Sequence, residues 1–325
     1  MTLKQVAEAA GVSLATVSYC LNDSGSVGQQ TRQRVKAIAE KLGYRPNLAA
    51  KAMRTGRTKA LGFVVPDLTN PFFPQLTQSV MAAASAAGYD VFLTDTFGAK
   101  DAESRSIAAL IRRGIDGLVW FPIDDAATPD IRLGRTPTVV IDRALDGLDS
   151  IVADCQAGGR LAAAALLEAG HRRIGMLSGP GDTQSARQRA AGARELIRGD
   201  AQLVWELEVA YSMDLDASVV ETLARADVTA VIAGADVVAI GVMKELTRMG
   251  RRVPQDISVV GFDNIPWSEL CSPGLTTIDM PVSDMGFEAV QAIVRRIGAP
   301  AEPRRRTVFD VSLMKRGSIA PPRTG

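Results

Sequence analysis

The pattern of apolar and polar residues predicts a short helix at the start of the chain. Over about 3–10, apolar residues recur at the spacing i, i+3, i+4, i+7 that places them on one helical face: Leu3, Val6, Ala7 and Ala10. Thr2 and Gln5 have the spacing of a capping box, in which each side chain bonds to the backbone N–H of the other. Gly11 supplies the permissive backbone at which such a helix ends.

Two further helices are predicted over about 14–21, with Ser13 as the N-cap, and over about 29–42. On the second helix, the residues that face the first are Val17, Cys20 and Leu21. The residues that point elsewhere are Leu14, Ala15, Ser18, Tyr19 and Asn22. Two short helices joined by a three-residue turn form the unit whose second helix enters the DNA major groove. A small protein-interaction module is the alternative interpretation of this pattern.

From Lys59 onward, short apolar runs alternate with amphipathic stretches, which is typical of parallel strands and helices. The runs that predict strands are ALGFVVP, DVFLTD, GLVWFP and PTVVID, then RRIGMLSG, WELEVA, VTAVIAG and ISVVGFDN. A last strand is predicted at about 307–313. The two series predict two doubly wound parallel-sheet lobes with a cleft between them. Ligands bind beyond the carboxyl ends of such strands, so polar residues there are the candidates.

Charge is distributed unevenly along the chain, although the whole carries a formal net charge of only +1. Residues 1–57 contain nine Lys or Arg against three Asp or Glu, a net of about +6. The remaining residues contain 28 basic and 33 acidic side chains, a net of about −5. A basic head on a mildly acidic body is expected where one end of a protein meets a polyanion. This distribution favours DNA binding over a protein-interaction module.

The sequence lacks the features of a secreted, membrane or metal-binding protein. Cys20, Cys155 and Cys271 lie far apart, with no spacing typical of a disulfide framework or a zinc site, and Cys20 is expected to pack as a core hydrophobe. MTLKQVAEAAGVS is not a basic leader followed by an apolar run, and no window approaches the roughly 20 apolar residues of a membrane span. We therefore expect a cytoplasmic protein.

Catalytic motifs are also missing from the sequence. The single histidine, His171, precedes RRIG and is expected to cap a helix end or to face solvent. There is no P-loop, no GxGxxG after the first strand, no GxSxG and no HExxH. The sequence therefore offers no obvious residues for hydrolytic or metal-dependent catalysis. We expect neither an enzyme nor a bound cofactor or metal.

Three strings in the first 57 residues resemble the head and hinge of the lactose/galactose-repressor family of bacterial transcriptional regulators: VSLATVSYCLN, TRQRV and LGYRPNLAAKAMRTGRT. The resemblance extends almost to the end of the chain in VPDLTNPFF, VVIDR, GHRRIG, RAAG, VPQDISVVGFDN and PGLTTI. It implies an N-terminal all-α helix-turn-helix domain at 1–45 and a hinge at 46–58. An α/β periplasmic-binding-protein-like core of two doubly wound parallel-sheet lobes would follow at 59–318, with a tail at 319–325.

The resemblance also implies that the chain passes between the two lobes three times. The passages are expected near 154–158, 279–283 and 313–316. The N-lobe would comprise about 59–156 and 281–313, and the C-lobe about 157–280 and 314–318. Some family members carry a leucine-heptad tail that joins dimers into tetramers, and the final IAPPRTG cannot form one. We therefore expect a twofold homodimer on a pseudo-palindromic stretch of double-stranded DNA.

The same resemblance assigns DNA contacts to the second helix and its surroundings. The residues implied to read base edges are Leu14, Ala15 and Tyr19, and those implied to contact phosphates or flanking bases are Thr2, Ser13, Thr16, Ser18, Asn22 and Thr31. Apolar side chains can contact thymine methyl groups, while hydroxyls and amides suit phosphate oxygens. Tyr19 replaces the Arg or His frequent at its position, and a phenol offers a single hydrogen bond. Packing on the helix surface is its alternative role.

A hinge helix is predicted over 48–55, because Pro46 biases the chain out of the preceding structure and Asn47 can cap a new helix. Eight residues are too few for a stable helix alone in water, so the segment is expected to fold only when something completes it. In the family this helix pairs with its dimer mate and inserts an apolar side chain into the minor groove. Met53 is the matching residue, and Asn47 and Ala50 are the other implied hinge contacts. An unstructured basic linker is the alternative.

Candidate effector contacts come from both lobes. Those implied by the resemblance are Asn70, Phe72, Phe73, Asp142 and Arg143 in the N-lobe, and Thr183, Ser185, Arg189, Tyr211, Ala235, Asp236 and Asp263 in the C-lobe. Carboxylates accept hydroxyl hydrogen bonds and arginine donates a planar fork, which favours a sugar or sugar derivative as the effector. Ala235 stands where sugar-sensing members can place Asn, so a nucleobase-like or other small polar effector is the alternative to a sugar. A helix cap or a surface ion pair is the alternative role for each carboxylate.

These features predict a sequence-specific DNA-binding transcriptional regulator, usually a repressor, whose operator affinity is controlled allosterically by a small polar effector. A coupling of about 1–3 kcal/mol between cleft and hinge would change operator affinity roughly 5- to 150-fold. A periplasmic-type solute-binding protein shares the core architecture, but the basic head and the missing secretory signal distinguish this chain from it. A small-molecule enzyme on the same lobes is the third alternative.

Overall fold

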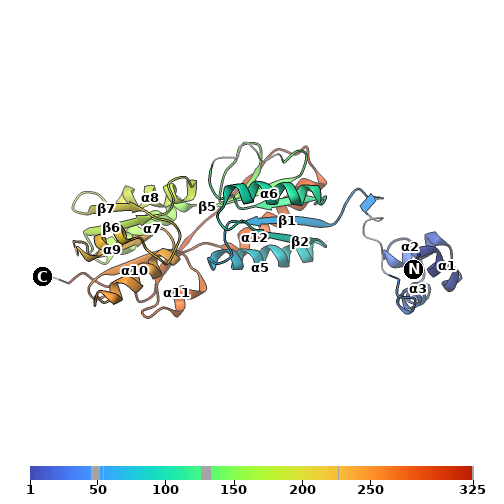
Figure 1. Cartoon of the computed structure of the whole chain (residues 1–325), viewed down its shortest axis with the longest axis horizontal. Coiled ribbons are helices and arrows are strands. Elements are labelled where there is room, and N and C mark those ends of the chain that lie inside the picture. The colour runs from blue at the N-terminus through green and yellow to red at the C-terminus, as the bar shows by residue number, and fades with distance from the viewer. Residues whose placement is uncertain (45–51, 54, 126–132, 226, 324–325) are drawn as a thin grey trace. The chain divides into compact units, whose positions relative to one another are not determined.

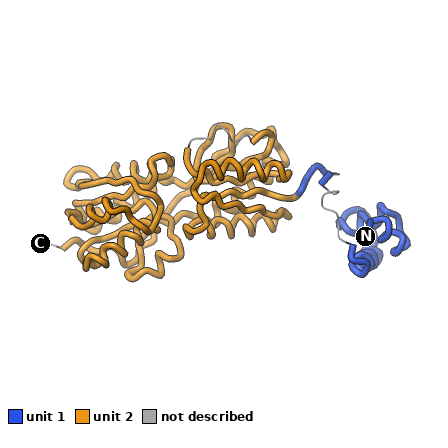
Figure 2. Tube along the Cα trace, viewed as in Figure 1, with its two compact units in different colours: residues 1–58 blue, residues 59–325 orange. Residues whose placement is uncertain are grey.

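The computed structural model describes residues 1–44, 52–53, 55–125, 133–225 and 227–323. The chain divides into two compact units, Met1–Thr58 and Lys59–Gly325 (Figure 2). The first unit is helical, and the second consists of two α/β lobes. The fold class predicted from the sequence is therefore confirmed.

The first unit contains the three predicted helices, α1 (Leu3–Ala10), α2 (Leu14–Leu21) and α3 (Gln29–Lys41). The capping box at the start of α1 is present, and Gly11 ends the helix at φ 62°, a left-handed conformation that favours glycine. The Ser13 side chain accepts from the backbone N–H of Thr16 and so caps α2. The local signals thus predicted these helix ends to within one residue.

The three helices share a small apolar core. Its fully or nearly fully buried members are Val6, Ala7, Ala10, Val17, Cys20, Val35 and Ala39. Cys20 is completely buried, so the prediction that it packs as a core hydrophobe is confirmed. The inner faces expected from the periodicity of the sequence therefore meet, and the outer face of α2 is left uncovered by the rest of this unit.

The second unit contains two six-stranded sheets, one in each lobe (Figure 1). The N-lobe sheet has the order β11-β5-β4-β3-β1-β2 and is parallel throughout. Its strands are β1 (Ala60–Val65), β2 (Asp90–Asp95), β3 (Gly117–Trp120), β4 (Thr138–Ile141), β5 (Asp149–Ala153) and β11 (Arg306–Phe309). Helices α5 (Phe72–Ala86) and α12 (Val282–Gly298) cover one face, and α6 (Lys100–Arg112) covers the other.

The C-lobe sheet has the order β12-β10-β9-β8-β6-β7, and only β12 is antiparallel to its neighbour. Its strands are β6 (Arg173–Ser178), β7 (Gln202–Glu208), β8 (Ala230–Ala233), β9 (Ser258–Asp263), β10 (Thr276–Asp279) and β12 (Ser312–Met314). Its helices are α7 (Cys155–Glu168), α8 (Gln184–Leu196), α9 (Ala217–Ala224), α10 (Asp236–Arg248) and α11 (Pro266–Leu270). The central strands β8 and β9 are buried throughout, as their apolar runs predict.

Two of the predicted strands, β2 and β7, lie at the edges of their sheets, and all of their residues are exposed or only partly buried. Composition could not reveal this, because an apolar run reports the preference for a strand and not the strand's place in the sheet order. The sequence analysis also missed β5 and β10 as strands. The last strand predicted at 307–313 is two strands, β11 and β12, which belong to different sheets.

The chain passes between the lobes between β5 and α7, between β10 and α12, and between β11 and β12. The third passage lies at 310–311, before the expected 313–316, because Ser312–Met314 pairs with β10 of the C-lobe. Three chain segments therefore connect the lobes, and the strand ends of both sheets meet around the region that they cross.

His171 is buried, which corrects the expectation that it caps a helix end or faces solvent. Only 1% of its surface is accessible, and Nδ1 lies 2.9 Å from the Thr229 hydroxyl. Nε2 lies 2.9 Å from both the Ser258 hydroxyl and the Ala320 carbonyl oxygen. The C-terminal segment passes over the ring, a return of the chain that no local pattern around His171 indicates. Burial lowers the pKa of His171 below its usual 6.5.

The variant His171→Leu is expected to be less stable than the natural chain by about 1–3 kcal/mol at pH 8, because it removes the hydrogen bonds of the buried ring to Thr229, Ser258 and Ala320. The neutral ring stabilises the fold fully above about pH 6.5, and this contribution is lost as the pH falls below that value, because the unfolded chain then binds a proton. Urea unfolding at pH 8 and pH 5.5 should therefore give a smaller difference between the two proteins at the lower pH. If the difference in unfolding free energy between the two proteins were the same or larger at pH 5.5, the stabilising role of the neutral His171 ring would be contradicted.

Candidate functional site

The outer face of α2 carries the residues that the sequence analysis assigned to base reading. Leu14 is 49% exposed and Tyr19 is 48% exposed, and Ala15 and Asn22 are also accessible. Thr16 and Ser18 are partly buried, and the Asn22 amide donates to the Ser18 carbonyl oxygen at 2.7 Å. Large apolar side chains exposed on a helix of a small basic unit are available for contacts with a groove of DNA.

The turn that follows α2 packs against the ring of Tyr19. At Gly25, φ is +67°, and a Cβ atom there would lie 2.9 Å from Cγ of Tyr19. The ring is therefore held on one side while the other side stays exposed. Packing and base contact, which the sequence left as alternatives for Tyr19, are compatible in this arrangement. Of the other candidates, Thr2 belongs to the capping box of α1, and Thr31, near the start of α3, is partly buried.

Most of the predicted hinge lies outside the described residues, including Asn47 and Ala50. Ala52 and Met53 are described and have helical backbone, and the Met53 side chain is 89% exposed. An apolar side chain this accessible has little contact with the rest of the chain. It is free to contact another molecule.

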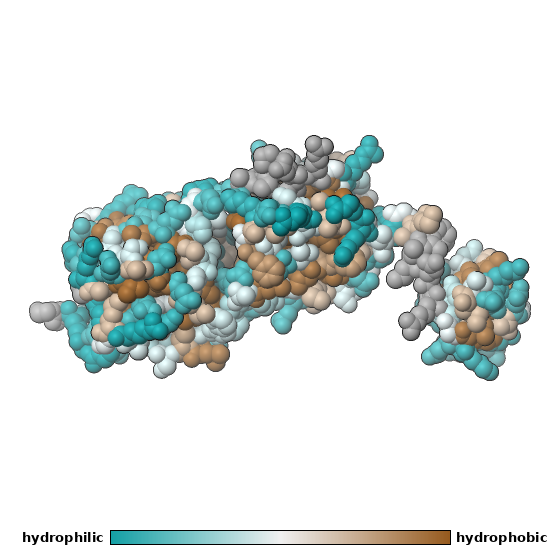
Figure 3. Space-filling model, in the orientation of Figure 1, coloured by the Kyte–Doolittle hydropathy of each residue, from teal (hydrophilic) through white to brown (hydrophobic). Residues whose placement is uncertain are grey.

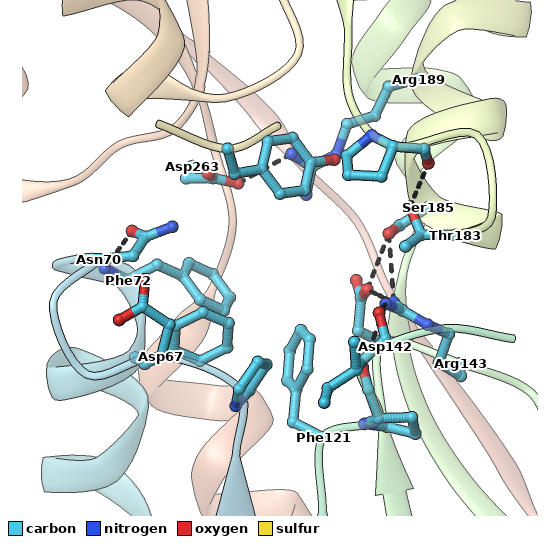
Figure 4. Close-up of a pocket in the computed structure, with 16 residues that line it drawn as sticks. Asp67, Asn70, Phe72, Phe121, Asp142, Arg143, Thr183, Ser185, Arg189 and Asp263 are labelled. Atoms are coloured by element: carbon cyan, nitrogen blue, oxygen red, sulfur yellow. Dashed lines mark hydrogen bonds and ion pairs between the residues drawn. The ribbon is translucent and has the colours of Figure 1, made fainter. Parts of the chain in front are cut away.

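A cavity of about 160 Å³ lies between the two lobes, beyond the carboxyl ends of strands from both sheets (Figure 4). The sequence-predicted residues that line it are Asn70, Phe72, Phe73, Asp142, Arg143, Thr183, Ser185, Arg189, Tyr211 and Asp263. The first five come from the N-lobe and the rest from the C-lobe. Residues distant in sequence are therefore brought to one enclosed site, at the position expected of ligand sites in open parallel sheets.

Three phenylalanine rings form the apolar side of the cavity. Phe73 and Phe121 meet edge to face with ring centroids 4.9 Å apart, and Phe72 lies 5.3 Å from Phe73 in the same manner. Figure 4 shows Phe72 and Phe121 across the cavity from Arg189 and Asp263. The cavity thus has one aromatic wall and one charged wall, which suits a ligand with an apolar face and polar edges.

Arg189 and Asp263 form a buried ion pair on the C-lobe side. Nη1 of Arg189 lies 3.1 Å from Oδ1 of Asp263 and also donates to the Gly234 carbonyl oxygen at 2.6 Å. The guanidinium stacks on the Phe262 ring, 3.9 Å from its centroid. Burial raises the pKa of the Asp263 carboxyl to about 7, while the charge of Arg189 acts in the opposite direction. The cavity therefore presents a paired cation and not a free one.

A second charged cluster connects the two lobes across the cavity. Arg143 pairs with Asp142 and also lies 3.3 Å from Asp125, both on its own lobe. The Ser185 hydroxyl, at the start of α8 in the C-lobe, donates to Oδ2 of Asp142 at 2.7 Å. Asp142 thus engages the opposite lobe as well as the cavity. Its hydrogen bond to Ser185 would be lost if the lobes moved apart.

Two of the three carboxylates that line the cavity sit in unusual backbone conformations at strand ends. Asp142 follows β4 with φ 70°, and Asp263 ends β9 with φ 109°. These are left-handed values that residues other than glycine rarely adopt, and they cost free energy. Such strain is typical of functional sites. There it points a side chain in a direction that a regular strand end would not give.

Arg143, Arg189 and Tyr211 each place a buried polar group in the cavity wall that has no hydrogen-bond partner within the described residues. Nε of Arg143 has an ion pair with Asp125, which leaves the Tyr211 hydroxyl and Nε of Arg189. Both groups are buried, and burial raises the pKa of Tyr211 to about 12, so the phenol keeps its proton. Buried donors without partners are uncommon in folded proteins. A ligand with hydroxyl or carbonyl oxygens would satisfy them.

Two predicted effector residues, Ala235 and Asp236, do not line this cavity, which corrects the sequence-based placement. Asp236 is fully buried and accepts from the Ser268 and Thr277 hydroxyls, each at 2.5 Å, and from the Ile265 N–H at 2.9 Å. Burial raises its pKa to about 6. The carboxylate lies under the sheet because it begins α10 and turns toward α11. Its contacts are those of a structural residue.

Other lining residues escaped the sequence analysis. They are Pro66, Asp67, Phe121, Pro122, Ile123 and Pro180. All follow the carboxyl ends of β1, β3 or β6. The rule that ligands bind at strand ends could have identified them, since the ends of these strands were visible as apolar runs.

Within the part of the chain that the structure describes, no group of His, Cys, Asp and Glu side chains is arranged to hold a metal ion. No described helix is long and apolar enough to cross a membrane. The fold and cavity together define a class of protein, a transcriptional regulator in which a helix-turn-helix unit precedes a periplasmic-binding-protein-like core.

Comparison with known proteins identifies the family. Residues 2–47 match the model described as bacterial regulatory proteins, lacI family, and residues 163–319 match a periplasmic binding protein-like domain. The ribose operon repressor of Bacillus subtilis (strain 168) is 36% identical over 300 residues, 90% of each chain. That of Escherichia coli (strain K12) is 31% identical over 329 residues, 98% of this chain and 99% of the relative.

Solved structures agree with this grouping. The lac repressor dimer bound to operator and the anti-inducer ONPF is 29% identical with a TM-score of 0.87, covering 98% of this chain and 99% of that one. A LacI family transcriptional regulator from Enterococcus faecium with bound ribose is 28% identical with a TM-score of 0.73, covering 81% and 100%. The chain therefore belongs to the lacI family of bacterial regulatory proteins and is a sequence-specific DNA-binding transcriptional regulator. The family resemblance of the sequence motifs is confirmed.

Proposed function

We propose that the chain is a sugar-responsive repressor, in which α2 reads an operator and a sugar bound between the lobes controls how tightly the operator is held. The observation that carries this proposal is the cavity between the lobes, whose lining combines three phenylalanine rings with buried donors that have no partner among the described residues. A sugar presents hydroxyls at its edge and an apolar C–H face, which match the two walls. Relatives named ribose operon repressors and a regulator solved with bound ribose support a sugar.

The effector we propose is a compact, uncharged sugar such as a pentose. The cavity of about 160 Å³ is smaller than the roughly 300–1,000 Å³ typical of sites for drug-sized ligands. Arg189 and Arg143 are each already paired with carboxylates, and Asp67 adds a further acid to the lining. A phosphorylated sugar would therefore meet no free cation among the described residues that line the cavity. The hydroxyls of a neutral sugar would accept from Tyr211 and donate to Asp142 or Asp263.

On DNA, the proposed contacts are those implied by the sequence, with Leu14, Ala15 and Tyr19 reading bases and the polar residues around them holding phosphates. The proposed hinge at 46–58 would fold against the minor groove, with Met53 as the inserted side chain. About half of the surface of the Leu14 and Tyr19 side chains stays exposed among the described residues of the first unit, so a groove of DNA can reach them. We propose that this takes place in the cytoplasm.

The working unit we propose is a twofold homodimer. Exposed apolar side chains gather on α5 and β2 of the N-lobe, including Met81 and Phe92, and on α11 of the C-lobe, namely Trp267 and Leu270. Figure 3 shows apolar groups on the face that carries α5 and α12 and near α11. A pair of contacts, one in each lobe, suits an interface that repeats through a twofold axis.

We propose that the protein has no catalytic activity of its own. Its relatives are transcriptional regulators. His171, the single histidine, is buried in the C-lobe by contacts with Thr229, Ser258 and Ala320, and it does not line the cavity. The three carboxylates that line the cavity, Asp67, Asp142 and Asp263, are all engaged by neighbouring donors, so none stands ready as a general base.

The proposal is tested with two measurements on the full chain. Duplexes selected by the protein from a random-sequence pool should converge on a pseudo-palindrome, whose affinity falls steeply with log[salt]. D-Ribose, other neutral monosaccharides and ribose 5-phosphate are then screened by thermal shift, and a hit is added to the DNA titration. A neutral pentose should raise the melting temperature and change DNA affinity roughly 5- to 150-fold. No sequence preference in the pool, or stabilisation by the phosphorylated sugar alone, would contradict it.

A further inference from the structure

Helix α8 carries two residues of the cavity, Ser185 and Arg189, yet it lacks an N-cap of its own. Thr183 occupies the N-cap position, but its side chain makes no capping hydrogen bond, and its hydroxyl instead donates to the Pro180 carbonyl oxygen at 2.9 Å. The first backbone N–H groups of a helix have no intrahelical acceptor. An acceptor for the start of α8 must therefore come from elsewhere.

The acceptor comes from the other lobe. Oδ1 of Asp125, in the segment after β3, accepts from the backbone N–H of Gln184 at 2.8 Å. Oδ2 of the same carboxylate lies 2.6 Å from Nη2 of Arg187, one turn into α8. The backbone N–H of Asp125 donates to the Asp182 carbonyl oxygen at 3.1 Å. One N-lobe residue thus makes three contacts with the start of a C-lobe helix.

The neighbours of Asp125 reinforce this junction. Lys100, the first residue of α6, pairs with Asp124 and lies 3.7 Å from the Asp182 carboxylate across the gap between the lobes. Arg143, which lines the cavity, lies 3.3 Å from Asp125. Asp125 and Arg187 themselves are absent from the cavity lining. The junction therefore connects to the effector site without forming part of it.

We propose that Asp125 is a positioning residue for the effector response, acting as an N-cap supplied by one lobe to a helix of the other. Closure of the lobes completes α8 and fixes Ser185 and Arg189, and opening removes the cap and leaves the first turn of α8 unsatisfied. The free energy of the cap thereby favours the closed arrangement, in which an effector is trapped. This inference rests on the proposed function for its effector, but the cap itself stands on the contacts alone.

The first test is amide hydrogen exchange in the ligand-free protein. In Asp125→Ala, peptides covering 183–188 should exchange about 5- to 30-fold faster than in the natural chain, the range of a lost helix cap. Peptides of α5 in the N-lobe should be unchanged. Asp125→Asn keeps an acceptor for the Gln184 N–H while losing the charge. Exchange of the same peptides in this variant should therefore be faster than in the natural chain and slower than in Asp125→Ala. Equal exchange of the 183–188 peptides in all three proteins would contradict the proposal that Asp125 caps α8.

The second test measures release of D-ribose by stopped flow. Asp125→Ala should raise the dissociation rate about 5- to 30-fold without slowing association, because the cap acts only after the lobes close. The control is Glu206→Ala. It removes the 2.8 Å ion pair between Glu206 of β7 and Arg194 of α8, which lies within the C-lobe and does not cross to the other lobe. It should release the sugar at the natural rate.

The outcomes separate the cap from the proposed function. Equal release rates in Asp125→Ala and the natural chain, or an equal effect in Glu206→Ala, would contradict a role in trapping the sugar. If the natural chain does not bind D-ribose, the proposed pentose fails, and the hydrogen-exchange result still decides whether Asp125 caps α8.

Discussion

Replacing Arg189 with alanine is expected to abolish the response to the effector while leaving operator binding near that of the natural chain. The change removes a cavity donor and leaves Asp263 buried without its cation. Breaking one partner of a buried ion pair costs about 3–5 kcal/mol. If half of that is expressed in binding, effector affinity falls at least about tenfold. Isothermal titration with the sugar and anisotropy with operator duplex measure the two effects separately.

Two further variants make this result interpretable. Asp263→Ala should lose the effector response in the same way, because it removes the other half of the pair. Arg194→Ala alters an exposed arginine on the same helix and should respond normally. Unchanged sugar titrations in both Arg189→Ala and Asp263→Ala would place the effector site elsewhere in the molecule.

Met53→Gly is expected to weaken operator binding by at least about tenfold while leaving sugar binding unchanged. The substitution removes the apolar side chain proposed to enter the minor groove, and it also raises the cost of forming a hinge helix. Met53 is almost fully exposed, so the variant loses few contacts within its own chain. Anisotropy titration of the selected pseudo-palindrome, with and without sugar, measures the effect.

Met53→Leu serves as the matched control, because it keeps an apolar side chain of similar volume. It should bind the operator at least as tightly as the natural chain. Equal operator affinity for Met53→Gly and the natural chain would remove the proposal that this side chain inserts into DNA. A loss of sugar binding in the glycine variant would instead indicate a defect in the core.

Local signals determined the helices of the first unit. Thr2, Gly11 and Ser13 act within a few residues of themselves, so the ends of α1 and α2 could be predicted closely. The same holds for the apolar runs that became β8 and β9, which are buried on both faces. Strand order is not local, so the apolar runs could not indicate that β2 and β7 lie at the edges of their sheets.

Some of the cavity residues could likewise be predicted from the sequence, and others could not. Asp142 and Asp263 follow or end strands whose apolar runs are visible in the sequence, so the strand-end rule and the family motifs both indicated them. Asp236 begins a helix at an equivalent place, but its side chain turns under the sheet to Ser268 and Thr277. The direction of a side chain at a helix start depends on which elements pack beneath it. Sequence spacing does not contain that information.

The sequence by itself determined the basic head, the helix ends, the succession of strands and helices and the family, because each depends on neighbouring residues or on motifs. Only the tertiary structure decided that His171 is buried under Ala320, and that Asp125 of one lobe caps α8 of the other. These contacts join residues that are 149 and 59 positions apart. They depend on how the two lobes pack against each other and on where the C-terminal segment lies in the fold. The periodicity of apolar residues in the sequence contains neither piece of information.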